Sequence, residues 1–218
     1  MYKYIVKRLM DIIFSVVGII VMFPVFILIS AAVYIDDPGP VLFRQKRIGK
    51  NKKFFTLHKF RSMKRSAPDL PTHMLTDPEQ YITRVGAFIR RTSLDELPQL
   101  FDILRHKMTF IGPRPALWNQ EDLIAEREKY GANDVLPGLT GWAQINGRDE
   151  LEIFEKAKLD GDYTAALNAG HFKGLAMDIR CFFRTFRAVL RADGVVEGGT
   201  GAMEPENRQI SDGENVLK

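Results

Sequence analysis

The chain has 218 residues, enough for one domain with a short appended segment. Its single cysteine, Cys181, excludes a disulfide framework and indicates a reducing compartment. The formal net charge of +4 is unevenly placed, because residues 38–65 hold ten Lys or Arg and no Asp or Glu. The rest of the chain is therefore net acidic.

The first predicted element is an apolar helix. Residues 12–35 form a run of 24 residues without a charge. As a straight helix this run would measure about 36 Å, enough to cross a hydrocarbon core of roughly 30 Å. It is too long for the apolar part of a usual signal peptide, and basic sequence follows it at once. We therefore expect the segment to stay in the mature protein.

Pro24 divides this apolar run into parts of 12 and 11 residues. A proline inside a helix removes a hydrogen bond and kinks the helix. Basic residues lie on both sides of the run, and positive charge gathers on the cytoplasmic side of membranes. These flanks fit a hairpin that enters and leaves the same face, and they fit a crossing helix equally well. Both arrangements place the rest of the chain in the cytoplasm.

Short elements are expected beyond the membrane segment. Two β-prone runs, 41–43 and 54–57, flank a polar link and predict a strand–turn–strand unit. Residues 65–80 and the stretches "IGPRPAL" and "LPGLTGWAQINGRDE" are typical of loops. The composition changes after Asp193, which predicts a disordered tail. Helices are expected at residues 80–90, 94–106, 118–130, 150–168 and 177–191.

The helix expected at 177–191 would carry two stripes. Its apolar stripe is Ile179, Phe182, Phe183, Phe186 and Leu190. Its basic stripe is Arg180, Arg184, Arg187 and Arg191. This pattern suits a core-facing helix with a solvated basic side, and it also suits a helix lying in a membrane interface. The hydrophobic anchor favours the interface.

The sequence "TSLDELPQLFDIL" places Asp95 and Glu96 side by side. One interpretation is helix capping, because Ser93 and Glu96 have the spacing of a capping box. Pro98 would then fall just past the first turn, where it starts to cost a hydrogen bond. A second interpretation is chemical: an Asp can be a nucleophile towards phosphorus, and a neighbouring Glu can hold Mg²⁺. The two interpretations are compatible, because a helix N-terminus also favours phosphate.

Isolated basic residues in turn-prone sequence point to an anionic substrate. The chain lacks the sequence motifs of phosphate loops, dinucleotide sites, zinc proteases and serine hydrolases. Its four histidines and one cysteine have no zinc-binding spacing. Guanidinium groups, in contrast, bind phosphates bidentately. The basic residues in question are Lys59, Arg61, Arg90, Arg91, Arg114 and Arg148.

Several stretches together resemble the bacterial sugar transferases, specifically the small monotopic polyprenyl-phosphate phosphoglycosyl transferases. They cover roughly residues 3–195 in family order. The stretches are "KRLMDIIFS", "DDPGPVLFRQKRIGKNKKFFTLHKFRSM", "VGAFIRRTSLDELPQLFDIL", "FIGPRPAL", "LPGLTGWAQINGRD" and "MDIRCFFRT". Two departures are Phe23, where many relatives have Ser, and Phe154, where Trp is common.

The resemblance implies an enzyme that moves a phospho-sugar from a UDP-sugar to undecaprenyl phosphate and releases UMP. It implies the bacterial inner membrane, with catalysis on the cytoplasmic face, and the first membrane step of a surface polysaccharide or glycoconjugate. Asp95 would be the nucleophile, forming a covalent aspartyl-phospho-sugar, and Glu96 would position Mg²⁺. Substrate-binding roles would fall to Lys59, Arg61, Arg90, Arg91, Arg114, Arg148 and Asp178.

The fold expected from the resemblance is α+β. Residues 1–36 would be a re-entrant membrane helical hairpin broken at Pro24, residues 37–195 a mostly helical cytoplasmic catalytic domain with a short β element, and residues 196–218 a flexible tail. Expected partners are the UDP-sugar, undecaprenyl phosphate and membrane lipids, without nucleic acid; a homodimer is allowed. The alternative is a membrane-anchored module whose basic run binds anionic lipid or nucleic acid without catalysis. A minor third interpretation is a phosphohydrolase.

Overall fold

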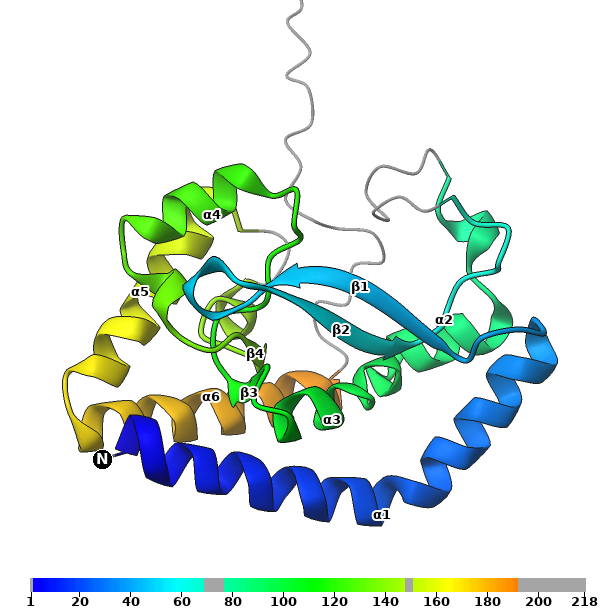
Figure 1. Cartoon of the computed structure of the whole chain (residues 1–218), viewed down its shortest axis with the longest axis horizontal. Helices are drawn as coiled ribbons and strands as arrows, with labels where there is room; N and C mark the ends of the chain where they lie inside the picture. Colours follow the sequence, from blue (N-terminus) through cyan, green and yellow to red (C-terminus); the bar gives the residue numbers. More distant parts are fainter. Residues whose placement is uncertain (1, 69–76, 148–150, 192–218) are drawn as a thin grey trace, which may run out of the picture.

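A computed structural model describes residues 2–68, 77–147 and 151–191 (Figure 1). The predicted tail at 196–218 and part of the predicted loop at 65–80 lie outside these residues. The regular elements are α1 (Lys7–Asp36), β1 (Leu42–Ile48), β2 (Phe54–Phe60), α2 (Arg84–Arg91), α3 (Gln99–Leu104), β3 (Thr109–Ile111), α4 (Glu121–Glu128), β4 (Gly138–Thr140), α5 (Ile153–Asn168) and α6 (His171–Arg191). Helices combined with small sheets confirm the mixed composition expected from the sequence.

The N-terminal helix α1 has an inverted distribution of polarity. It continues through Pro24, and Figure 1 shows it running along the bottom of the molecule and then turning upward. Its buried residues in the first half are polar and recur every four positions: Lys7, Asp11 and Ser15. Its exposed residues are apolar: Ile13, Phe14, Val17, Ile20, Val21, Phe23, Ile27 and Leu28. By length and composition, the helical segment Tyr2–Asp36 could cross a membrane.

Two small sheets lie in the rest of the chain. β1 and β2 pair antiparallel with Leu42 opposite Phe60 and Ile48 opposite Phe54, which confirms the strand–turn–strand prediction, although both strands are longer than expected. β3 and β4 pair parallel through three residues each. The second sheet was not predicted: β4 falls in a stretch that was interpreted as a loop, and β3 lies at the edge of another, where no element was assigned.

The predicted helices form with shifted bounds. The segment expected at 94–106 consists of a 3₁₀ turn, η5 (Leu94–Glu96), followed by α3. Helix α6 begins at His171, six residues before the predicted start. The helices expected at 80–90, 118–130 and 150–168 are shorter than predicted, as α2, α4 and α5.

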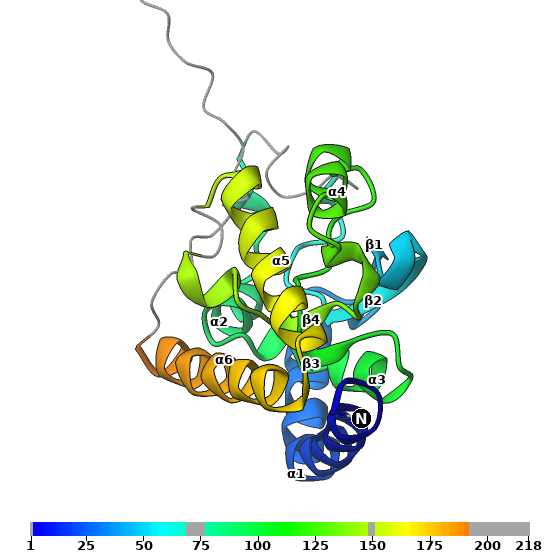
Figure 2. The same ribbon diagram turned by 90° about the vertical axis from the view of Figure 1, so that its left-hand side faces the viewer.

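The candidate site lies where the β1–β2 hairpin meets η5, the turn immediately before α3. Helices α1 and α6 lie side by side along one face of the molecule, with the β1–β2 hairpin, α4 and α5 on the other side of them (Figures 1 and 2). Between β2, α3 and β3 lies a core of Leu57, Leu100, Ile103 and Met108. This packing fixes β2 against the segment that carries Asp95 and Glu96.

Candidate active site

The acidic pair lies on the 3₁₀ turn η5, immediately before α3. Ser93, at the start of this turn, has φ of 56° and makes no side-chain capping bond. The capping-box interpretation is therefore wrong, because the Ser93 backbone is left-handed and its hydroxyl does not accept from the turn. Pro98 occupies the N-cap position of α3 with helical backbone angles, where its missing N–H costs nothing. Neither carboxylate is consumed in capping.

Two cations hold the acidic pair. Lys59 of β2 places Nζ 2.8 Å from Glu96 Oε1 and 3.7 Å from Asp95 Oδ2. Arg114 donates from NH2 to the same Glu96 Oε1 at 2.7 Å. The Asp95 side chain is 11% exposed and that of Glu96 17%. The structure thus brings together four predicted site residues from three separate segments, at the edge of solvent.

The two carboxylates have different electrostatic environments. Burial raises the pKa of Asp95, the Glu96 charge adds to this effect, and Lys59, Arg114 and Arg90 oppose it. Burial also disfavours the charged form of Glu96, but attraction to Arg114 and Lys59 outweighs burial and holds its pKa below the usual range. Glu96 is therefore the firmly ionised member of the pair.

Arg90 approaches the pair from α2. Its Nε donates to Ser62 Oγ at 2.8 Å, just past the end of β2, and its charge acts on Asp95. Helix α2 lies tightly against this point, since a Cβ on Gly86 would come within 1.9 Å of the Ser62 carbonyl oxygen. Thr83 starts α2 with a side-chain cap on the Gly86 N–H. The arginine is thus positioned by a close backbone contact.

The other predicted substrate-binding residues lie elsewhere. Arg61 forms an ion pair with Asp37 at 2.7 Å and bonds the Asp37 carbonyl at the end of α1. Arg91 is exposed. Asp178 is buried and accepts from Lys7 at 2.6 Å, as well as from two tyrosines, Tyr2 and Tyr163. Arg148 lies outside the described residues.

The loop that carries Arg114 is fastened at both ends. At its start, the backbone of Gly112 approaches Gly138 so closely that a Cβ on Gly138 would lie 2.2 Å from the Gly112 nitrogen. At its end, Arg47 donates from NH1 to the Pro115 carbonyl at 2.9 Å. Arg47 was not among the predicted site residues, because its position in a basic run made it look like a surface cation.

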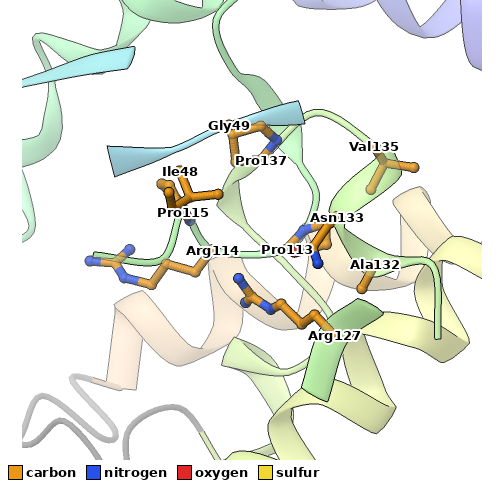
Figure 3. Close-up of a pocket in the computed structure, with 10 residues that line it drawn as sticks. All are labelled: Ile48, Gly49, Pro113, Arg114, Pro115, Arg127, Ala132, Asn133, Val135 and Pro137. Carbon is orange, nitrogen blue, oxygen red and sulfur yellow. The ribbon is translucent and has the colours of Figure 1, made fainter. Parts of the chain in front are cut away.

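A small, open pocket adjoins this loop (Figure 3). Its wall includes Gly49, Pro113, Asn133 and Arg127. Figure 3 shows the Arg114 side chain extending away from the other lining residues, which is consistent with its bond to Glu96. Neither Asp95 nor Glu96 is among the residues that line this pocket.

The basic run at 38–65 is partly used inside the protein. Arg47, Lys59 and Arg61 bond the Pro115 carbonyl, Glu96 and Asp37, respectively. On the hairpin, Arg44, Lys46, Lys50, Lys52 and Lys53 are exposed. The inward cations are better explained by an internal acidic site than by a lipid or nucleic-acid surface.

Residues 2–192 match the sequence model of a protein family, the bacterial sugar transferases. The chain belongs to the bacterial sugar transferase family.

Curated relatives share substantial identity with the chain. It is 40% identical over 194 residues to an undecaprenyl-phosphate glucose phosphotransferase of Komagataeibacter xylinus, covering 83% of this chain and 35% of the relative. It is 43% identical over 153 residues to a UDP-glucose:undecaprenyl-phosphate glucose-1-phosphate transferase of Escherichia coli, covering 69% and 33%. The chain thus spans about a third of the length of these two relatives. The sugar transferase EpsL of Bacillus subtilis is 36% identical over 191 residues, covering 88% of this chain and 90% of its own.

Proposed function

We propose that this protein transfers a phospho-sugar from a UDP-sugar to undecaprenyl phosphate and releases UMP. The observation that carries the proposal is the acidic pair itself: Asp95, nearly buried, beside Glu96, with Lys59 and Arg114 bound to the same Glu96 oxygen. A carboxylate held among cations suits attack on a doubly charged diphosphate, since the cations offset the repulsion between the anions. The activities for which these relatives are named support the same reaction.

In the first step, a carboxylate oxygen of Asp95 attacks the phosphorus that carries the sugar. A bond forms between this oxygen and the phosphorus, and the bond from the phosphorus to the UMP oxygen breaks, its electron pair leaving with UMP. The product is an aspartyl-phospho-sugar. Arg114 and Lys59 would stabilise the charge that develops on the phosphate oxygens, and Arg90 lies close enough to act on Asp95.

In the second step, a phosphate oxygen of undecaprenyl phosphate attacks the same phosphorus. The new phosphorus–oxygen bond links lipid and phospho-sugar through a diphosphate, and the bond to Asp95 breaks, restoring its carboxylate. No net proton is required in either step when the phosphates are ionised. Catalysis by Asp95 therefore depends on positive charge near the phosphates rather than on a general base.

The residues present are suited to Mg²⁺. Among the residues described, no group of three His, Cys, Asp or Glu side chains is arranged for a metal. Mg²⁺ is, however, often held by only one or two carboxylates together with substrate phosphates and water. Glu96, which is held in its ionised form by Lys59 and Arg114, would be the residue that holds the metal. Mg²⁺ would there neutralise charge on the diphosphate.

We place the reaction at the cytoplasmic face of the bacterial inner membrane. The inverted polarity of α1 supports a lipid environment, because its apolar face is exposed and its polar face packs on the protein. Exposed Phe172, Phe182, Phe183 and Phe186 add an apolar surface on α6, beside α1 (Figure 2). In this arrangement α1 enters the bilayer and returns at Pro24 as a re-entrant hairpin. The lipid phosphate and the water-soluble donor can then meet at the headgroups.

The test is UMP release by purified protein in lipid nanodiscs with Mg²⁺, undecaprenyl phosphate and a panel of UDP-sugars. We expect release by the wild type, none by Asp95→Asn, and normal release by the control Asp122→Asn, an exposed carboxylate on α4. A mass increment of one phospho-sugar on the peptide that contains Asp95 would identify the covalent adduct. Equal release by Asp95→Asn and wild type would refute the nucleophile, and no release with any donor would refute the reaction.

A further inference from the structure

Arg47 connects the β1–β2 hairpin to the loop that carries Arg114. Its Nε and NH2 donate to Gln45 Oε1 at 2.9 and 2.6 Å, and its NH1 donates to the Pro115 carbonyl at 2.9 Å. Gln45 lies two residues away on the same face of β1. Gln45 therefore orients the Arg47 guanidinium, and the hydrogen bond to the Pro115 carbonyl joins it to the loop.

Backbone contacts extend this connection. The N–H of Ile48 donates to the Ala116 carbonyl at 2.9 Å, and Arg47 and Leu117 form an isolated antiparallel bridge. Pro113 and Pro115 restrict the backbone on each side of Arg114. The loop start is held by the close approach of Gly112 and Gly138. Arg114 thus sits on a short, stiff segment whose far end depends on Arg47.

The two arginines are also electrostatic neighbours. Burial of its guanidinium and the charge of Arg114 lower the pKa of Arg47 to about 9, and Glu96 opposes this shift. Like charges held together disfavour the folded state, and here the Glu96 charge offsets part of this repulsion. A diphosphate bound at the acidic pair would attract both guanidinium groups and so reduce the repulsion between them.

We propose that Arg47 is a positioning residue, which holds the Gly112–Leu117 loop so that Arg114 is presented to Glu96 and to the diphosphate of the donor. Arg47 acts through the Pro115 carbonyl rather than by touching substrate. The proposal rests on the function proposed above for Asp95 and Glu96.

A double-mutant cycle tests this role. We expect Arg47→Met to lower kcat/KM for UMP release by about 10- to 100-fold, since a misplacement of about 1 Å can cost that much. Arg47→Lys should lose activity as well, because lysine keeps the charge but lacks the fork that joins Gln45 and Pro115. Arg44→Met removes a charge from the exposed face of the same strand, and it should retain wild-type activity.

The decisive variant is the pair Arg47→Met/Arg114→Met. If Arg47 acts through Arg114, the double variant will match Arg114→Met within about threefold, because interacting sites are non-additive. Losses that multiply would overturn the proposal, as would an Arg47→Met variant as active as Arg44→Met. If Arg47→Met fails to fold, Gln45→Leu removes the acceptor that orients the guanidinium, and normal activity in that variant would equally contradict the role.

Hydrogen–deuterium exchange separates this proposal from the proposed reaction. We expect the amides of Ile48 and Leu117, which donate to the Ala116 carbonyl and to Gln120 Oε1, to exchange at least tenfold faster in Arg47→Met than in Arg44→Met. This comparison requires no catalysis. Faster exchange in a protein that never releases UMP would support the positioning role and reject the reaction. Unchanged exchange would overturn the positioning role even in an active enzyme.

Discussion

The buried ion pair between Arg127 of α4 and Asp160 of α5 provides a test of how these two helices are held together. Arg127 NH2 lies 2.5 Å from Asp160 Oδ2, with the two side chains 5% and 1% exposed. Asp160 Oδ1 has no hydrogen-bond partner within the described part of the chain. Arg127 therefore supplies the hydrogen-bonded cation of this carboxylate, and Lys156 adds a weaker attraction.

Removing one partner leaves an uncompensated buried charge, which typically costs about 3–5 kcal/mol. We expect Arg127→Met to lower the free energy of unfolding by that amount and the Tm by roughly 6–20 °C, at about 2–4 °C per kcal/mol for a chain of this size. Replacing both residues, as Arg127→Met/Asp160→Leu, should cost about 1 kcal/mol or less, because apolar side chains of similar volume need no partner.

Thermal unfolding followed by circular dichroism in nanodiscs measures these differences. Burial raises the pKa of Asp160, and Arg127 opposes it. Without the arginine the folded state binds a proton more tightly than the unfolded state, so the deficit should shrink as the pH is lowered from 8 to 5. A double variant that loses the sum of both single losses would refute the reasoning, because additive losses would mean that the two side chains do not compensate one another.

Further predictions concern backbone contact, the thiol and the metal. Gly86→Ala should destabilise the protein by about 1–3 kcal/mol, although Ala has the better helix propensity. The reason is that the new Cβ would lie 1.9 Å from the Ser62 carbonyl oxygen. An unchanged Tm would contradict this contact. Burial and the charge of Asp178 raise the pKa of Cys181 to about 12, so the native thiol should resist iodoacetamide at pH 8 and react fully in denaturant. Removal of Mg²⁺ with EDTA should abolish UMP release and leave the Tm within about 2 °C, since Lys59 and Arg114 already compensate the charge of Glu96. Restored release on adding Mg²⁺ distinguishes this from damage.

The acidic pair and its partners could be predicted because short motifs carry them. Asp95, Glu96, Lys59 and Arg114 each lie in a stretch with a recognisable chemical character, and the structure brings them within ion-pair distance. The hairpin was predictable for a similar reason, since two β-prone runs flank a polar turn. The sequence could not show which of several similar cations lie beside the acidic pair. Arg61 has the same chemistry as Arg114, yet it binds Asp37.

The parallel pair of β3 and β4 could not be predicted from a local pattern. Each strand has three residues, too few to show alternation, and their partners are separated by about thirty positions. Glycine at 112 and 138 indicated turns from the sequence, whereas here it permits the close approach of two backbones. Arg47 was missed for a related reason. It lies in a basic run, and only its contacts in three dimensions distinguish it from the exposed cations beside it.

The polar contacts of α1 constrain the order in which the chain can fold. Lys7 bonds Asp178, 171 residues further along, and Tyr2 bonds the same carboxylate across 176 residues. At about 5–20 residues per second, the ribosome needs roughly 10–35 s to supply this partner. During that interval Lys7 and Tyr2 have no partner from α6, although Arg8 can already bond the Ile103 and Leu104 carbonyls. The contacts of Lys7 and Tyr2 with Asp178 therefore form only after α6 has been made, and chains truncated before His171 should have a start that is more accessible to protease than that of the full chain.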